Sequence, residues 1–371
     1  MSKLRVGVIG CGDISAIYLK NFKERFQTLE VTACAAKTLA HAQARADEYG
    51  IAKACTVEEI LADPNIDIVL NLTVPAVHGE INLKALASGK HVYSEKPLAS
   101  SVSEASRILN LAKKKGLMVG CAPDTFLGGA LQTCRKLLDD GWIGKPVAVN
   151  AFMMSAGPES WHPDPEFLYN QGAGPMFDMG PYYLTAMVSL LGGVKKVASF
   201  SRITYPERTI TSQPRFGQKI RVEEPTYVSG LMEFENGAIG NLIASFDIQG
   251  STLPYLEIYG SQGTLLVPDP NFFSGPVKIR RAGTEEFTEA PLVFGFTQNY
   301  RGLGLAEMAQ AMRGGRKNRA NGEMALHILE IMNGFQESGV KGHEYLLKSK
   351  IVRPDLFPIG INENYFNLEN G

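Results

Sequence analysis

The sequence lacks the features that mark several large classes of protein. No apolar run approaches the ~20 residues of a membrane-spanning helix, and the start has no long apolar core with a small-residue cleavage site. The net charge of -1 gives no electrostatic reason to expect nucleic acid or an anionic membrane surface as a partner. None of the five cysteines forms a C-x-x-C pair, so no disulfide framework or metal site is indicated. We therefore expect a cytoplasmic protein.

The chain has 371 residues, too many for one ordinary core, so two domains are expected. In roughly the first third, short apolar segments alternate with amphipathic ones, with a short third unit after the second strand. Strands are predicted at Leu4–Ile9, Glu30–Ala35, Ile66–Leu72, His91–Ser94 and Leu117–Cys121. This alternation predicts an α/β Rossmann domain, a doubly wound parallel sheet, over residues 1–123.

Beyond Pro123 the alternation stops, and several predicted strands follow one another with few helices between them. Glu235-Asn236-Gly237 is typical of a β-hairpin turn. This pattern predicts an α+β domain over residues 124–371, a mostly antiparallel sheet with helices on one face. We expect this domain to bind the substrate and to mediate oligomerisation. The second face of such a sheet must be solvated or paired, so we expect a homodimer or homotetramer through it.

A glycine loop, Gly10-Cys11-Gly12-Asp13-Ile14-Ser15, joins the first predicted strand to an amphipathic helix. In this position the G-x-G-x-x-S pattern predicts dinucleotide binding. Gly10 allows the tight turn, and Gly12 allows a pyrophosphate to approach the helix N-terminus. We expect Gly10, Gly12, Asp13 and Ile14 to contact the cofactor. A purely structural glycine turn is the alternative.

The end of the second strand decides which dinucleotide is expected. An NAD site usually has an acidic residue there for the ribose hydroxyls, whereas this chain has Ala36-Lys37-Thr38. Lys37 and Thr38 can both donate to a 2′-phosphate. We expect NADP or NAD as cofactor, with NADP slightly favoured. A solvated loop lysine explains Lys37 equally well.

Two further segments follow predicted strands, at the sheet edge where parallel strands present their carboxyl ends. We expect Thr73, Val74, Pro75 and His78 from the first segment to border the cofactor, with Glu95, Lys96 and Pro97 from the second. Ser101 and Glu104 predict a capping box that starts the next helix. The alternatives are a solvated lysine beside a turn-forming proline and a histidine that only begins a helix.

A second stretch with chemical potential runs from Gly172 to Tyr183. Asp178 and Tyr182, four residues apart on one predicted helix, share a face. With Lys96 they supply the groups that hydride transfer at a carbinol carbon requires. The alternative is a capping Asp178 beside a core Tyr182. Asp124, Trp161 and His162 are further candidates for substrate contacts, although a surface position explains His162 equally well.

The glycine loop, Glu95-Lys96-Pro97 and the Gly-rich approach to Asp178 together resemble the glucose–fructose oxidoreductase, inositol dehydrogenase and rhizopine-catabolism (Gfo/Idh/MocA) family. The resemblance spans nearly the whole chain. It implies a Rossmann domain, an α/β domain with a large open sheet, bound NAD(P), and polyol, sugar or cyclitol substrates. Many members have His four residues after the Asp. Tyr182 stands there in this chain, similar to glucose–fructose oxidoreductase, where a Tyr serves as acid and base.

The resemblance implies an NAD(P)-dependent oxidoreductase that moves a hydride between nicotinamide and a carbinol or carbonyl carbon. The expected substrate is a sugar, sugar derivative or cyclitol. Lys96 and Tyr182 would share the proton transfer, and Asp178 would orient them. The alternative is a catalytically silent NAD(P)-binding sensor of sugar or redox state. A sensor has no need of these three groups together, which favours the enzyme.

Overall fold

The computed structural model describes residues 3–366, which divide into two compact units. Within the described residues, the first unit contains 3–129, 293–329 and 354–366, and the second contains 130–292 and 330–353. This division differs from the predicted domains 1–123 and 124–371, because two later segments return to the first unit. The carboxylate of Asp124, for example, accepts hydrogen bonds from the backbone of Gly302 and Gly304.

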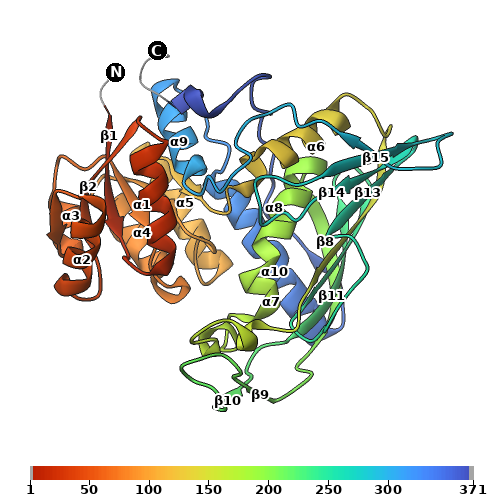
Figure 1. Ribbon diagram of the computed structural model, residues 1–371, viewed down its shortest axis with the longest axis horizontal. Helices are drawn as coiled ribbons and strands as arrows, with labels where there is room; N and C mark the ends of the chain where they lie inside the picture. The colour runs from red at the N-terminus through yellow and green to blue at the C-terminus, as the bar shows by residue number, and fades with distance from the viewer. Residues whose placement is uncertain (1–2, 367–371) are drawn as a thin grey trace. The chain divides into compact units, whose positions relative to one another are not determined.

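The first unit is built on a six-stranded parallel sheet in the order β3-β2-β1-β4-β5-β6, which confirms the predicted doubly wound topology (Figure 1). Most side chains of its central strands are buried, as expected for parallel strands covered on both faces. The strands are β1 (Leu4–Ile9), β2 (Leu29–Ala35), β3 (Lys53–Cys55), β4 (Ile68–Asn71), β5 (His91–Ser94) and β6 (Val119–Cys121). The helices are α1 (Asp13–Glu24), α2 (Leu39–Tyr49), α3 (Val57–Ala62), α4 (His78–Ala87), α5 (Val102–Lys115), α9 (Leu303–Arg313) and the first part of α10 (Gly322–Lys341).

Helix α5 starts at a cap that differs in part from the predicted capping box. The Ser101 side chain accepts from the Glu104 backbone N–H at 3.2 Å, as predicted. The Glu104 carboxylate, however, accepts from the backbone N–H and the hydroxyl of Ser100, at 3.2 and 2.9 Å. Only half of the box is therefore formed, because Ser100 offers two donors to the carboxylate that Ser101 was expected to engage.

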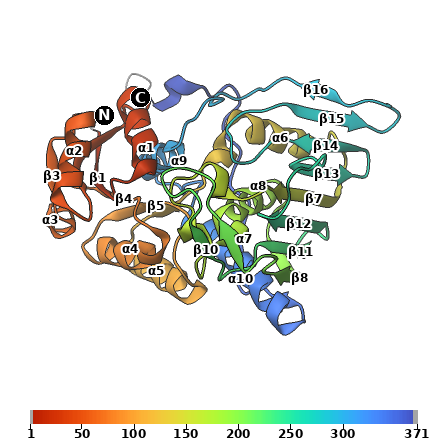
Figure 2. The ribbon, with the colours of Figure 1, turned by 60° about the horizontal axis from the view of Figure 1, so that its bottom comes forward.

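The second unit is built on a nine-stranded sheet in the order β16-β15-β14-β13-β7-β12-β11-β8-β17 (Figure 2). Every pair is antiparallel except β7 with β12, so the predicted mostly antiparallel sheet is confirmed. Its strands are β7 (Pro146–Met154), β8 (Val194–Arg202), β11 (Tyr227–Phe234), β12 (Ile239–Ser245), β13 (Leu256–Gly260), β14 (Gly263–Val267), β15 (Val277–Arg281), β16 (Thr288–Ala290) and β17 (Tyr345–Leu346). A separate hairpin of β9 (Glu207–Thr209) and β10 (Lys219–Arg221) was not predicted, because strands of three residues carry too little periodicity.

Helices cover one face of the large sheet and leave apolar side chains on the other. Helices α7 (Gly174–Asp178), α8 (Gly180–Leu191) and the rest of α10 pack on the strands, while α6 (Gly129–Asp139) precedes β7 in the chain. Alternate residues on β8, β11 and β12 point away from the helices, and among them Phe200 is 86% exposed, with Leu231 and Ile239 exposed as well. The uncovered face of this sheet therefore carries exposed apolar side chains.

The predicted helix carrying both Asp178 and Tyr182 is in fact two helices. Helix α7 ends at Asp178, and α8 begins at Gly180. Pro181 has no N–H and cannot continue the hydrogen-bond pattern of α7, and the N–H of Tyr182 bonds the carbonyl of Met179 at 3.1 Å. The spacing of four therefore spans a break between two helices, so the predicted single helix is wrong. The shared face of Asp178 and Tyr182 stays a prediction.

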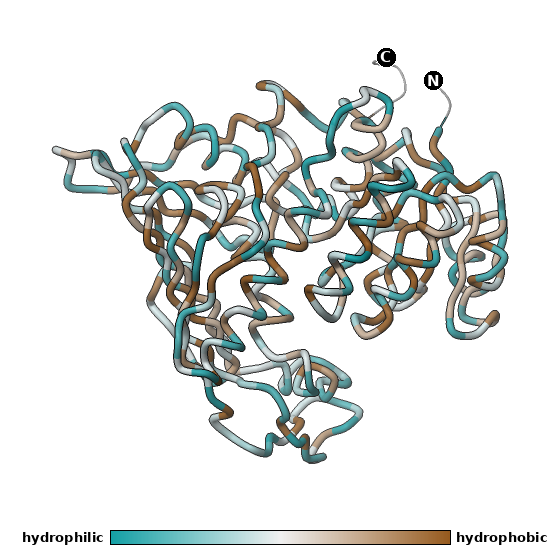
Figure 3. Tube along the Cα trace, turned by 180° about the vertical axis from the view of Figure 1, so that it is seen from behind, coloured by the Kyte–Doolittle hydropathy of each residue, from teal (hydrophilic) through white to brown (hydrophobic). Residues whose placement is uncertain are grey.

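Hydrophobic and hydrophilic stretches alternate along the chain trace (Figure 3). Among residues 3–366, no helix combines the length and the apolar character that crossing a membrane requires.

Candidate active site

The two glycine positions in the loop between β1 and α1 differ in whether the fold leaves room for a side chain. Gly10 has a φ of 107°, and a Cβ there would lie 2.5 Å from the backbone of Leu72, so the fold itself requires glycine. Gly12 has a φ of -75°, and a Cβ there would meet nothing within 4 Å. The open space at Gly12 lies at the N-terminus of α1, which has no side-chain cap. The residues present therefore fit the pyrophosphate of a dinucleotide.

Apolar side chains next to this loop are exposed at the carboxyl edge of the sheet. Ile14 is 37% exposed and Val74 65% exposed, and Asp13 and Pro75 are exposed too. Thr73 is half-buried beside them. A ligand that covered this edge would remove apolar surface from water. The cofactor contacts expected here stay predictions.

The segment after β2 and helix α2 each contribute one cation, Lys37 and Arg45, to the first unit. Lys37 and Thr38 are exposed, and the Thr38 hydroxyl caps α2 by accepting from the His41 N–H at 3.3 Å. Arg45, on α2, was not predicted. Its Nη2 lies 3.4 Å from the carbonyl oxygens of both Cys11 and Gly12. Nothing in the local pattern of α2 distinguishes this arginine from an ordinary solvated one.

A buried polar network fixes the loop after β4. The Asn71 side chain donates to the Asn82 side chain at 2.9 Å and to the His78 carbonyl at 3.1 Å. The Thr73 hydroxyl donates to Asn71 Oδ1 at 2.6 Å. Asn71 and Asn82 were missed, although an Asn at the end of an apolar strand is an available signal. The network holds the backbone of Thr73 in one place.

His78 does not have the position that was expected for a cofactor contact. It is the first residue of α4 and is 1% exposed. Its Nδ1 lies 2.7 Å from the Pro97 carbonyl, and its Nε2 lies 2.8 Å from the Thr73 carbonyl. Both ring nitrogens are engaged by backbone, so His78 ties the loops after β4 and β5 to each other.

Glu95 fixes the segment that carries Lys96. One carboxylate oxygen accepts from the Tyr18 hydroxyl at 2.7 Å, and the other accepts from the Lys96 backbone N–H at 3.0 Å. Burial raises the pKa of Tyr18 well above its usual range, which keeps its hydroxyl a donor. Lys96 is half-buried two residues after the end of β5, and its bond to Pro97 is cis. The Tyr18 contact was not predicted, since α1 and β5 are far apart in the chain.

Asp124, which was expected to contact substrate, belongs to the core of the first unit. It is 1% exposed, and one of its oxygens accepts from the N–H groups of Gly302 and Gly304 at 2.9 and 3.0 Å. These bonds hold the start of α9. Burial raises the pKa of Asp124 to about 6.

This burial predicts a pH-dependent stability. An Asp whose folded-state pKa is raised binds its proton more tightly when folded, so stability is lost as pH rises through the folded pKa. With a pKa of about 6 for Asp124 against ~3.9 in the unfolded chain, the loss is about 3 kcal/mol. Asp124→Asn, whose amide oxygen can accept the same bonds, should remove this fall between about pH 4 and pH 7. Urea unfolding across this range tests it, and parallel curves for the two proteins would contradict it.

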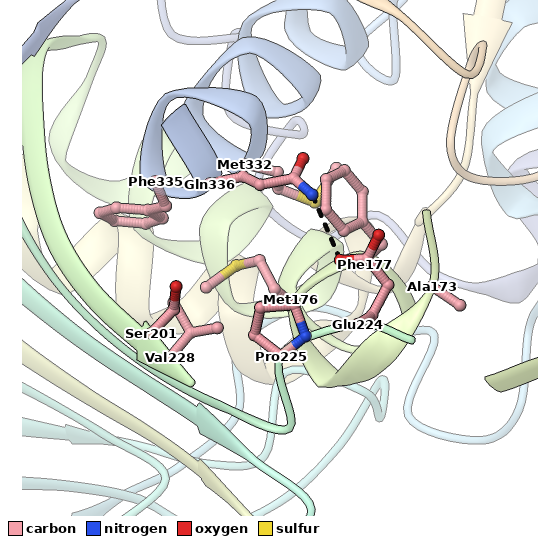
Figure 4. Close-up of a pocket in the computed structure, with 10 residues that line it drawn as sticks. All are labelled: Ala173, Met176, Phe177, Ser201, Glu224, Pro225, Val228, Met332, Phe335 and Gln336. Atoms are coloured by element: carbon pink, nitrogen blue, oxygen red, sulfur yellow. Dashed lines mark hydrogen bonds between the residues drawn. The ribbon is translucent and has the colours of Figure 1, made fainter. Parts of the chain in front are cut away.

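In the second unit, a buried carboxylate holds the approach to Asp178. Glu224 accepts from the Gly172 N–H at 2.7 Å. It also accepts from the Gln336 side-chain amide at 3.2 Å (Figure 4). Burial raises the pKa of Glu224. Gly174 has a φ of 75°, and a Cβ there would lie 3.0 Å from the Pro225 carbonyl oxygen. Glycine is therefore needed at the start of α7.

The pocket drawn in Figure 4 adjoins the segment that leads to Asp178. Its lining includes Met176, Phe177, Met332, Phe335 and Glu224. Its volume is about 20 Å³, which is room for about one water molecule. It is a packing void, too small for a sugar. Asp178 and Tyr182, which follow Met176 and Phe177 in the chain, are both half-buried.

Trp161 and His162 follow a segment that is anchored by a buried arginine. Arg208 pairs with Glu159 and, at 2.7 Å, with Asp247. Glu159 also accepts from the Tyr169 hydroxyl at 2.7 Å. Trp161 itself is exposed and His162 half-buried. Neither Arg208 nor Glu159 was predicted, because their pairing depends on residues far apart in the chain.

The expected site residues are divided between the two units. The first unit contains all the expected cofactor contacts and Lys96. The second contains Asp178, Tyr182, Trp161 and His162. Among residues 3–366 no group of three or more His, Cys, Asp or Glu side chains could hold a metal ion.

The chain is similar to known oxidoreductases in sequence and in fold. An uncharacterized oxidoreductase of Schizosaccharomyces pombe is 29% identical over 199 residues, 52% of this chain and about half (53%) of that protein. The scyllo-inositol 2-dehydrogenase (NAD(+)) of Bacillus subtilis is 27% identical over 273 residues, 71% of this chain and 74% of that protein. The structure of levoglucosan dehydrogenase in complex with NADH has the same fold, with a TM-score of 0.81 at 20% identity over 94% of this chain and all of that one.

Two family models match consecutive parts of the chain. The model of an oxidoreductase family with an NAD-binding Rossmann fold matches residues 4–122. The model of the Gfo/Idh/MocA C-terminal domain matches residues 131–266. The first matched region includes the glycine loop and Lys96, and the second includes the Gly-rich segment before Asp178. The chain therefore belongs to the Gfo/Idh/MocA family of oxidoreductases, whose N-terminal domain is an NAD-binding Rossmann fold.

Proposed function

We propose that the protein is an NAD(P)-dependent oxidoreductase acting on a carbinol or carbonyl carbon of a sugar, sugar derivative or cyclitol. The observation that supports it best is the glycine loop. Gly12 leaves open space at the N-terminus of α1, although the packing of the fold would allow a side chain there. Lys96 follows β5 in the same unit, with its backbone fixed by Glu95. By their names, relatives of this chain act on cyclitols and sugars, among them scyllo-inositol and D-xylose.

In this proposal the bound nicotinamide supplies the acceptor or donor of the hydride. Lys96 and Tyr182 share the proton of the substrate hydroxyl, taking it during oxidation and returning it during reduction. Asp178 orients these groups and the sugar. Glu224, through Gly172, holds the backbone that leads to Asp178, and the Tyr18–Glu95–Lys96 contacts hold the backbone of Lys96.

A panel of aldoses, polyols and cyclitols with each cofactor tests the proposal through the absorbance of reduced nicotinamide. We expect turnover of at least one class of these compounds. The alternative is a silent NAD(P)-binding sensor of sugar or redox state. Tight cofactor binding together with a silent panel would support the sensor and refute the enzyme.

We also propose that NADP(H) is accepted and slightly preferred over NAD(H). Support comes from the exposed Lys37 and Thr38 after β2, and from Arg45 against the glycine loop. Ala36→Asp introduces the carboxylate that NAD sites use and that repels a 2′-phosphate. It should shift the ratio of the two dissociation constants toward NAD(H) by on the order of 1–3 kcal/mol. Fluorescence titration measures both constants, and at least tenfold tighter binding of NAD(H) by the unchanged protein would contradict the preference.

We propose further that the apolar sheet face of the second unit pairs with a second copy of the chain, giving a homodimer or homotetramer. Phe200, Leu231 and Ile239 support this, since they are exposed on strands whose other side is covered by helices. Sedimentation equilibrium tests it, and a monomer at micromolar concentration would contradict it.

For the cellular location we propose the cytoplasm, since all five cysteines lie among the described residues as free thiols.

A further inference from the structure

Three aromatic rings form an exposed cluster on the second unit. The His162 ring lies between Trp161 and Phe167, with centroid distances of 5.4 and 5.3 Å and edge-on geometry. Trp161 is 69% exposed and Phe167 is 50% exposed. Large aromatic side chains usually gain stability by burial. A pair that is left in water on one loop is therefore a candidate for binding something else.

The loop that carries this cluster is tied down at several points. Arg215 pairs with Asp164 and, at 2.7 Å, with Glu166. The hydroxyl of Ser212 donates to the His162 carbonyl. The segment before it is anchored by the Arg208 pair with Glu159. A surface that is already ordered loses less entropy when it binds a ligand.

The cluster also offers one directed hydrogen-bond donor. The Nδ1 of His162 accepts from the Asp164 backbone N–H at 3.0 Å. In a neutral imidazole the remaining hydrogen then sits on Nε2, which makes Nε2 a donor. The cluster therefore combines two apolar ring surfaces with a donor between them.

The position of the cluster relates it to the proposed catalytic carboxylate. Phe167 lies in the 3-10 helix η4 (Glu166–Leu168), which contacts α7. Asp178 is the last residue of α7. Because the cluster and Asp178 are on neighbouring elements of one unit, a ligand on the rings would lie next to the chemistry.

We infer that Trp161, His162 and Phe167 form a subsite for a second sugar ring, so that the substrate class is a disaccharide or other glycoside. A pyranose has an apolar C–H face that stacks on aromatic rings and a rim of hydroxyls that accept from a donor such as His162 Nε2. This inference deepens the proposed function and depends on it for the reacting ring.

Chain-length preference tests the subsite. Cellobiose and lactose are compared with glucose and galactose as substrates of the wild type, Phe167→Ala and Trp161→Ala. The ratio of kcat/KM for each disaccharide to that for its monosaccharide should fall about tenfold in both variants, the usual cost of truncating an aromatic anchor. Phe272→Ala, which removes an exposed aromatic elsewhere in the same unit, should leave the ratio unchanged. A wild type without preference for the longer sugars, or variants with an unchanged ratio, would overturn the subsite.

Binding without turnover separates this inference from the proposed function. The chain has two tryptophans, Trp142 and Trp161, so Trp142→Phe leaves Trp161 as the reporter. Cellobiose or lactose should change its fluorescence at lower concentration than glucose or galactose. A fluorescence response with no turnover of any sugar, polyol or cyclitol would support the subsite and refute the oxidoreductase. No response to the disaccharides in a protein that oxidises monosaccharides would refute only the subsite.

Discussion

Replacing Lys96 with alanine is expected to lower kcat on the order of 10²–10⁴-fold, the usual contribution of a general acid–base group. Lys96 is half-buried at the carboxyl end of β5, and its backbone N–H is held by Glu95. The cofactor should still bind, because the glycine loop is unchanged. The absorbance of reduced nicotinamide measures kcat, and fluorescence titration measures the dissociation constant of the nucleotide.

Two further variants show what the lysine does. Lys96→Arg retains the positive charge but not a group that releases its proton, so it should remain impaired. Lys84→Ala removes an exposed lysine paired with Glu80 on α4, and it should behave as the wild type. Full turnover in Lys96→Ala would show that Lys96 has no part in proton transfer.

Replacing Gly12 with glutamate is expected to weaken NAD(P) binding on the order of 100-fold or more, since juxtaposed like charges cost several kcal/mol. The melting temperature should hardly change, because a Cβ at Gly12 meets nothing within 4 Å and the φ of -75° suits any residue. Isothermal titration with NADP and NAD gives the affinity, and calorimetry gives the melting temperature.

Gly250→Glu is the matched control. Gly250 lies in the second unit, also has nothing within 4 Å of a Cβ, and lacks a left-handed φ. Its substitution should leave both affinity and melting temperature unchanged. If Gly12→Glu binds nucleotide as the wild type does, the cofactor does not lie at this loop. If it melts well below Gly250→Glu, Gly12 is structural after all.

The first unit was predictable because its signals are local. Parallel strands buried on both faces appear as short apolar runs, and the segments that follow them must lie at the same sheet edge. This is why Gly10, Gly12, Thr73 and Lys96 could be placed from the sequence. The return of residues 293–329 to this unit has no local signal, since it depends on packing between distant segments.

The wrong expectations for site residues also arise from contacts between segments that are far apart in the chain. His78 and Asp124 are polar residues close to a predicted ligand edge, but their partners are backbone groups of Pro97, Gly302 and Gly304. A sequence pattern does not show which distant backbone group will satisfy a buried side chain. The break between α7 and α8 is different, because it was predictable from the sequence. Pro181 lies at the start of α8 and indicates a helix boundary there, whereas the prediction of one helix used only the spacing of Asp178 and Tyr182.

The central claim, that this chain moves a hydride between nicotinamide and a sugar or cyclitol carbon, is tested most directly by isotope transfer. Reduced NADP carrying deuterium as its transferable hydride is incubated with the protein and a panel of aldoses, ketoses and keto-cyclitols, and the products are analysed by mass spectrometry. We predict that at least one compound is reduced to an alcohol with deuterium on the new carbinol carbon, and that Lys96→Ala gives little of it. Bound nucleotide with no deuterium in any product, and the same result with deuterated NADH, would contradict the claim.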